Sequence, residues 1–229
     1  MESSRKYILY QTSPNTQTLE STYPPTSEAP PVSYNIKSNP KGGFMNRHPH
    51  MVITKHECGL NLYLAEVRFE IYGYGTTIAY KEAGASQSLF LEHHREHQYE
   101  VSIDGTDHRW QPLGPSQEVL ELTKDAGKKV ALFVYAEKVP QRRASAPISL
   151  EHFEAEDVGE IHIMDEFEGG QLALEQILCT AVVVVERAKR RATNTGLASW
   201  ESVSSKKHYF GRPESRSRSD GPASSSSSS

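Results

Sequence analysis

The stretch ILCTAVVVVERAKRR, Ile177–Arg191, limits the possible folds of this chain more than any other segment. Eight of its first nine residues are apolar, and five of its last six are charged. A membrane-spanning helix, a buried strand and a core helix would each suit such a run. A spanning helix needs about 20 predominantly apolar residues. The apolar run is shorter than this even when it is extended back to Leu172, and it then includes Glu175 and Gln176, so we expect no membrane span here.

A core helix suits this segment better than a strand does. Residues 171–191 contain no Gly or Pro, and the run is long for a strand. Its flanks are strong helix formers, and its cationic end suits the negative end of a helix dipole. The four consecutive valines at 182–185 favour a strand instead, because β-branched side chains are stiff. Length and flanks favour a helix, and a helix that is apolar on nearly every side must be surrounded by protein.

The chain between about His50 and this helix has the pattern of a β protein. Short runs rich in β-branched and aromatic residues alternate with turn residues. Asp104 and Gly105 separate two such runs, which is typical of a tight hairpin. We count about nine to twelve candidate strands. The sequence therefore predicts a mainly β fold, a closed antiparallel β-barrel around a hydrophobic C-terminal helix at about residues 171–191.

The two ends of the chain differ in composition from this central part. Residues 1–43 are rich in Pro, Ser and Thr, and proline weakens strand pairing. We expect this segment to be a poorly ordered leader with at most one edge strand, at residues 6–11. Residues 44–191 would then form the barrel domain, and the Ser-rich residues 192–229 a disordered tail.

The composition gives no global attraction to nucleic acid or to an anionic membrane, because the net charge is −4. Any such partner must use a local basic patch. The two cysteines, Cys58 and Cys179, do not make a disulfide framework, and the first residues lack the apolar stretch of a secretory signal. We therefore expect an intracellular protein, cytoplasmic by default, with a peripheral membrane or nuclear location as alternatives. No cofactor motif is present, and no nucleic acid partner is indicated.

The densest basic cluster is at the end of the predicted helix, at Arg187, Lys189, Arg190 and Arg191. As the end of a buried helix, these side chains would emerge together at one mouth of the barrel. Such a cluster would suit an anionic lipid headgroup, an acidic protein or a nuclear-import receptor. The simpler interpretation is that these cations complement the negative end of the helix dipole and make the protein more soluble.

Two further candidates lie on loops and hairpins. Trp110 follows Arg109 on the second strand of the Asp-Gly hairpin. Either Trp110 is a core residue and Arg109 pairs outside, or the two residues line the rim of a ligand site. Ser145 follows two arginines in a Pro-flanked loop, a pattern that makes it a phosphorylation candidate.

The histidines in LEHHREH are the metal-ligand candidates. His93 and His97 would lie at ligand spacing on a helix, with His94 beside them, but HHREH does not have the HExxH order of a zinc site. The flanking residues favour a strand, where these side chains would form a solvated polar face. A metal site at His93 and His97 is the less favoured alternative.

The hairpin IDGTDHRWQPLG, residues 103–114, resembles the tubby C-terminal-like superfamily, as does the pairing of GEIHIMDEF with the helix LALEQILCTAVVVVERAKRR. This group includes tubby domains, phospholipid scramblases, plant LURP-one-related proteins and small fungal members. The resemblance implies a closed barrel threaded by a hydrophobic helix. The tubby phosphoinositide site and the scramblase calcium segment have no residue-by-residue match here.

From these observations together we expect a non-catalytic intracellular binding module of tubby-like type. Its expected partner is an anionic phospholipid or an acidic protein. One alternative is a small-ligand carrier built on a barrel, although a helix that fills the lumen argues against it. A metal-dependent enzyme that uses His93, His94 and His97 is the other, and we expect no enzymatic activity.

Overall fold

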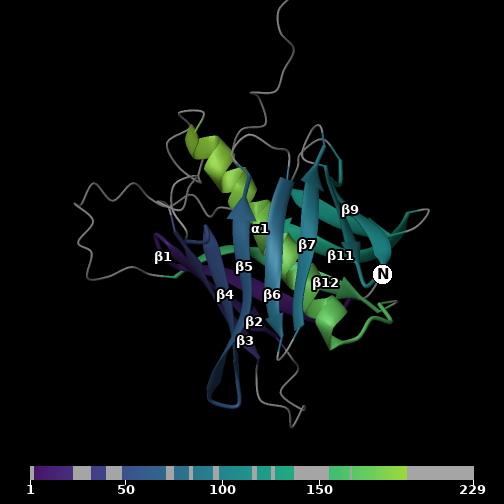
Figure 1. The fold of residues 1–229 in the computed structure, drawn as a ribbon. Helices are drawn as coiled ribbons and strands as arrows, with labels where there is room; N and C mark the ends of the chain where they lie inside the picture. Colours follow the sequence, from purple (N-terminus) through teal and green to yellow (C-terminus); the bar gives the residue numbers. More distant parts are fainter. Residues whose placement is uncertain are drawn as a thin grey trace, which may run out of the picture.

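A computed structural model describes residues 3–22, 32–39, 48–70, 75–82, 85–94, 98–114, 118–124, 127–136, 155–165 and 167–194. Within these ranges, twelve antiparallel strands close into one barrel around a single α-helix (Figure 1). The predicted fold class is therefore confirmed.

Each strand of the barrel pairs with its neighbours in the chain, and β1 pairs with β12 to close the sheet. The elements are β1 Ser3–Ser13, β2 Thr16–Ser21, β3 Ser33–Ser38, β4 Met51–Glu57, β5 Leu60–Phe69, β6 Gly75–Glu82, β7 Ala85–His93, β8 Tyr99–Ile103, β9 Thr106–Pro112, β10 Val119–Lys124, β11 Lys128–Tyr135, β12 Glu156–Met164 and α1 Gln171–Asn194.

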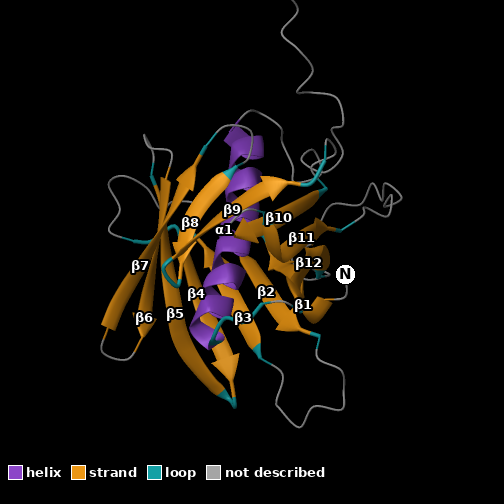
Figure 2. Ribbon diagram, turned by 90° about the vertical axis from the view of Figure 1, so that its right-hand side faces the viewer, coloured by secondary structure: helices purple, strands orange, loops and turns teal. Residues whose placement is uncertain are grey.

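The helix α1 passes through the middle of the barrel (Figure 2). Every residue from Ala173 to Ala188 is at most 9% exposed, including the four valines that locally favour a strand. Burial on all sides therefore outweighs their β propensity, as the apolar run predicted. In the described part of the chain, no helix is long and apolar enough to cross a bilayer.

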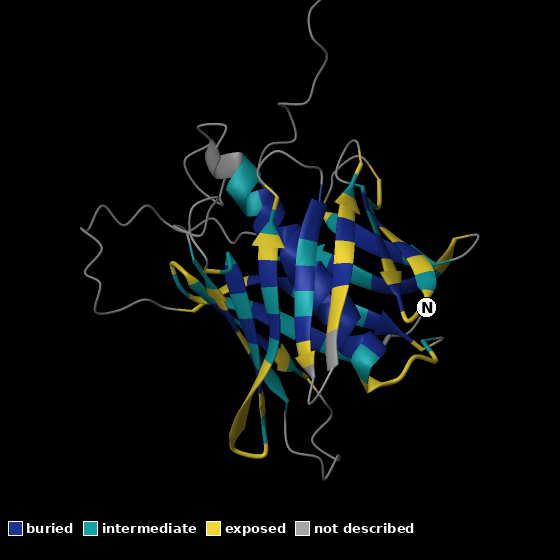
Figure 3. Cartoon of the chain, in the orientation of Figure 1, coloured by how far each residue is buried: buried dark blue, intermediate teal, exposed yellow. Residues whose placement is uncertain are grey.

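The wall of the barrel alternates between inward and outward side chains. On β4, for example, Met51, Ile53 and Lys55 are buried while the residues between them are half-buried. This is the two-residue period of a strand with one face on a core. Figure 3 shows the buried inner wall around the equally buried helix.

The prediction that residues 1–43 are a leader outside the barrel is wrong, because β1, β2 and β3 are all barrel strands. Residues 6–11, the expected edge strand, lie within β1, which pairs with both β2 and β12. The prolines fall between strands rather than inside them. Pro14 is in the β1–β2 turn, and the other five lie outside the described residues. The barrel thus begins with the first described residues.

Two hairpins have the backbone that their sequences predict. Asp104 and Gly105 have φ values of 49° and 72°, which a tight hairpin turn requires. Cys58 and Gly59, with φ values of 51° and 78°, make the same kind of turn between β4 and β5. The helix extends to Asn194, beyond its predicted end at 191, and the rest of the predicted tail lies outside the described residues.

The enclosure of α1 predicts a large effect of a charge at Val183, which is 0% exposed. We expect Val183→Asp to lower the free energy of unfolding by about 4 kcal/mol or more, since its carboxylate would be buried without a partner. Urea denaturation would measure this loss. The control Val183→Ala removes only methyl groups, and we expect a loss of about 2 kcal/mol. A soluble Asp variant with an unchanged transition midpoint would contradict the buried helix.

Candidate functional site at the mouth of the barrel

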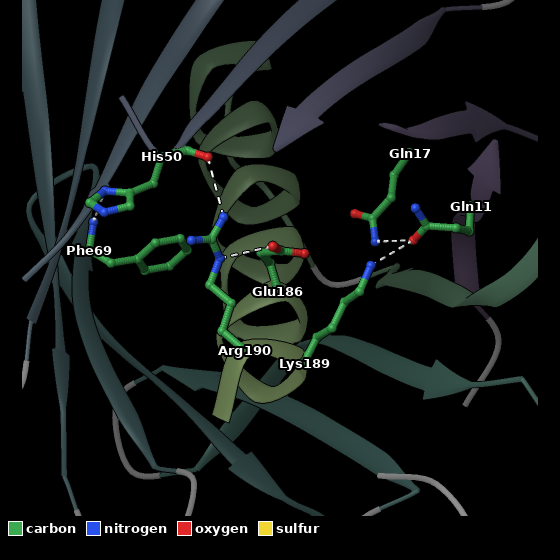
Figure 4. A network of polar contacts seen from close by, with 7 residues as sticks. All are labelled: Gln11, Gln17, His50, Phe69, Glu186, Lys189 and Arg190. Atoms are coloured by element: carbon green, nitrogen blue, oxygen red, sulfur yellow. Dashed lines mark hydrogen bonds and ion pairs between the residues drawn. The ribbon is translucent and has the colours of Figure 1, made fainter. Parts of the chain in front are cut away.

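The C-terminal end of α1 lies in one mouth of the barrel, near the end of β1 and the start of β2. Figure 4 shows the polar contacts there: Lys189 points toward Gln11 and Gln17, whereas Arg190 points the other way, toward His50 and Phe69. The helix end therefore contacts the wall on more than one side.

Arg187 is the deepest of the four predicted cations. It is 9% exposed, and its guanidinium donates to the carbonyl oxygen of Gly75 at 2.8 Å and to Thr76 Oγ1 at 2.5 Å. Burial lowers the pKa of Arg187 and the like charge of Arg191 lowers it further, whereas Tyr99 and the Glu70 carboxylate raise it in part. Both hydrogen-bond acceptors are neutral oxygens, and no ion pair of Arg187 occurs among the described residues. This buried charge is therefore not compensated by a direct carboxylate partner.

Lys189 is also held by a neutral group. Its Nζ donates to Gln11 Oε1 at 3.1 Å, and Gln17 Nε2 donates to the same oxygen at 3.1 Å. Gln17 is itself buried. An amide oxygen positions the ammonium but does not cancel its charge, so Lys189 adds to the positive potential of the mouth.

Arg190 has a structural role. Its Nε lies 2.9 Å from Glu186 Oε1, its guanidinium lies 4.8 Å from the centre of the Phe69 ring, and it contacts the His50 carbonyl oxygen at 3.4 Å. Glu186 is only 4% exposed. Arg190 therefore compensates a buried carboxylate while it packs on an aromatic ring.

The prediction that the four cations emerge together is wrong in its geometry. Arg187 is buried against β6, Lys189 turns to β1, and Arg190 turns to Phe69 on β5. Arg191 is half-buried, and like Arg187 it lowers the pKa of Tyr99, which burial raises. Since α1 turns by about 100° per residue, neighbouring cations must diverge once a wall surrounds the helix. Their role in binding an anion stays a prediction.

The prediction of a ligand rim at Trp110 is wrong as well. Trp110 is 0% exposed, and its Nε1–H donates to Thr180 Oγ1 on α1 at 3.1 Å. Arg109 lies on the outside, where its Nε donates to Glu100 Oε1 at 2.9 Å. Successive residues of β9 point to opposite faces, so this pair follows the other interpretation, with a core Trp and an Arg paired outside.

The histidines and Ser145 are described only in part. His93 lies at the end of β7 with its ring 5.0 Å from that of Tyr99, and His94 Nε2 lies 3.1 Å from Glu100 Oε2. His97 and Ser145 lie outside the described residues. In the described ranges, no three His, Cys, Asp or Glu side chains gather as metal ligands.

A buried ion pair at the other end of α1 is a feature that the sequence interpretation missed. Lys55 Nζ lies 2.9 Å from Glu175 Oε1 and 2.7 Å from Glu57 Oε2, and Lys55 and Glu175 are both buried. Burial lowers the pKa of Lys55, but its hydrogen bonds to Glu57 and Glu175 raise it more. The signal was present, since Lys55 is in phase with Met51 and Ile53 and Glu175 interrupts the apolar run.

A double-mutant cycle tests this pair. We expect Lys55→Met to lower the free energy of unfolding by about 3 kcal/mol, because it leaves Glu175 buried without its cation. Glu175→Leu should cost less, because Lys55 keeps its ion pair with Glu57. The double variant should stay within about 1 kcal/mol of the unmodified protein. Chemical denaturation of the four proteins measures the coupling. Losses that simply add would mean that the two side chains do not interact.

Comparisons with known families, curated proteins and solved structures give no match for this chain.

Proposed function

We propose that this protein is a non-catalytic binding module of tubby-like type that associates peripherally with anionic phospholipid headgroups inside the cell. The binding surface is the barrel mouth at the C-terminal end of α1. The observation that carries the proposal is the buried guanidinium of Arg187, whose hydrogen-bond acceptors within the described residues are both neutral oxygens. The tubby-like part of the proposal rests on the sequence motifs quoted above.

The charges at this mouth favour an anion. Arg190 is paired with Glu186, whereas Arg187 and Lys189 have a carbonyl, a hydroxyl and an amide as their hydrogen-bond acceptors. Charges in a partly dry recess act over longer distances than charges in open water, because low-dielectric walls focus the field. Glu70 compensates the charge of Arg187 only through space, and an anionic group that arrives at the mouth would add a direct partner.

The chemistry of these side chains favours binding over catalysis. Guanidinium and ammonium groups hold carboxylates and phosphates by charge and by directed hydrogen bonds, which is the chemistry of a binding surface. The carrier alternative needs an open lumen, and the centre of the barrel holds the side chains of α1 from Ala173 to Ala188. We therefore propose neither a small-ligand carrier nor a metal-dependent enzyme.

Vesicle binding tests the proposal. We expect the protein to co-sediment at low salt with vesicles that contain phosphatidylserine or a phosphoinositide, and not with pure phosphatidylcholine. Each cation near such a surface contributes about 1 kcal/mol, so Lys189→Gln with Arg191→Gln should weaken partitioning at least about tenfold. Added salt should release the bound protein.

The matched control is Lys81→Gln with Lys129→Gln, which removes the same charge from ion pairs on the outer wall. This control should bind vesicles like the unmodified protein. Equal losses in the two double variants would show that general charge, not the mouth, governs binding. No binding at low salt would contradict the lipid proposal and favour an acidic protein as the partner.

A further inference from the structure

The seam between β7 and β8 is the weakest closure of the barrel. These strands pair only at Glu92 with Glu100 and at His93 with Tyr99, next to one bond from the His94 N–H to the Gln98 carbonyl oxygen. Every other seam pairs at least five residues on each strand. Beyond the two pairs the strands diverge (Figure 2). The barrel thus has one seam that is held by a short ladder.

Two strand edges at this seam are not paired with each other. Leu89–Leu91 of β7 and Val101–Ile103 of β8 have no pairing with each other, although β6 and β9 pair with their other sides. In a sheet, alternate residues of an edge strand direct N–H and C=O groups to the open side. Such an edge is a template for one more strand.

A surface groove of about 680 Å³ lies at the same place. Phe90 and Glu92 of β7 line one side, and the groove continues over Glu100 and Ser102 of β8 to Asp107 of β9. Phe90 is 49% exposed, which is unusual for a large aromatic side chain. The unpaired edges therefore lie beside a mainly polar groove in which Phe90 is an exposed apolar side chain.

Both signs of charge line the groove, with Arg109 and Lys124 on the side away from β7. On the β7 side, the charge of Glu92 favours a basic occupant. Glu92 and Glu100 are direct cross-strand neighbours, and like charges in that position repel each other. Arg109 and His94 hold Glu100, whereas Glu92 is exposed and has no ion pair among the described residues. A cation next to Glu92 would relieve this repulsion. A second copy of the chain would bring the same glutamates to the groove, so it suits the site less well.

We propose that the groove between β7 and β8 binds an extended segment of a partner protein, which adds as a strand to the edge of β7. Phe90 and Glu92 are two residues apart and both point outward. Since Glu92 is already paired with Glu100, the added strand lies beside Leu89–Leu91 and places an apolar residue opposite Phe90. A Lys or Arg two residues along the partner, at the end of the added strand, is then on the same face and reaches toward the Glu92 carboxylate. This surface is on the barrel wall, so the inference does not depend on the lipid proposal for the mouth.

A labelled peptide tests the inference in the full-length protein. The probe is acetylated Thr-Lys-Thr-Ile-Thr-Lys-Thr-amide, whose Lys and Ile side chains share one face and suit either strand direction. We expect saturable binding by fluorescence polarisation, weakened at least about tenfold by Glu92→Lys and also weakened by Phe90→Ser. Both positions are exposed, and thermal melting would verify that the variants stay folded.

Three controls separate strand addition from general attraction. Glu20→Lys reverses an exposed carboxylate on β2, a strand that pairs fully on both sides, and should leave binding unchanged. A peptide with Glu in place of both Lys residues should not bind, because it reverses the charge. A peptide with Pro in place of Thr at positions 3 and 5 should not bind either, since proline cannot join a ladder. Binding of the Pro peptide, equal losses in Glu92→Lys and Glu20→Lys, or no saturable binding of the probe would each overturn the inference.

Discussion

The rest of the structure depends on the complete enclosure of α1. A helix that is mostly apolar, and buried at every residue from Ala173 to Ala188, has no stable place on a protein surface. A sheet can surround it only by closing, and the pairing of β1 with β12 makes that closure. Once a helix fills the lumen, every inward side chain of the wall meets it. The barrel and the helix are therefore one core rather than two layers.

Polar contacts then fix the position of the helix, because apolar packing has little direction of its own. Thr180 meets Trp110 in the middle, Glu175 meets Lys55 at one end, and Arg187 meets β6 at the other. These three contacts point to different sides of the wall and so define both the rotation and the depth of α1. The two proposed binding surfaces lie where this arrangement is incomplete: at the mouth, where Arg187 has no ion pair among the described residues, and at the β7–β8 seam.

The sequence was sufficient to predict the barrel and its central helix, because a long apolar run without Gly or Pro can be buried in few ways. It was misleading for β1 to β3, where the number of prolines outweighed the alternation that buries Leu9, Leu19 and Ile36. The directions of Arg187 and Arg190 depend on which strand of the wall stands opposite each, and no local pattern contains that information. The short pairing of β7 with β8 likewise depends on how the two strands align in the folded barrel, so no local sequence pattern predicts it.

Native-state hydrogen exchange of the amides in α1 tests the central claim most directly. If the helix is the core of a closed barrel, the amides from Ile177 to Val185 can open only when the whole barrel unfolds. Their exchange should then report the same free energy as the amides of β11 and β12, and it should depend on urea in the same way. Helix amides that exchange at a clearly lower free energy, with the strands still protected, would show that α1 leaves the barrel and would contradict this account.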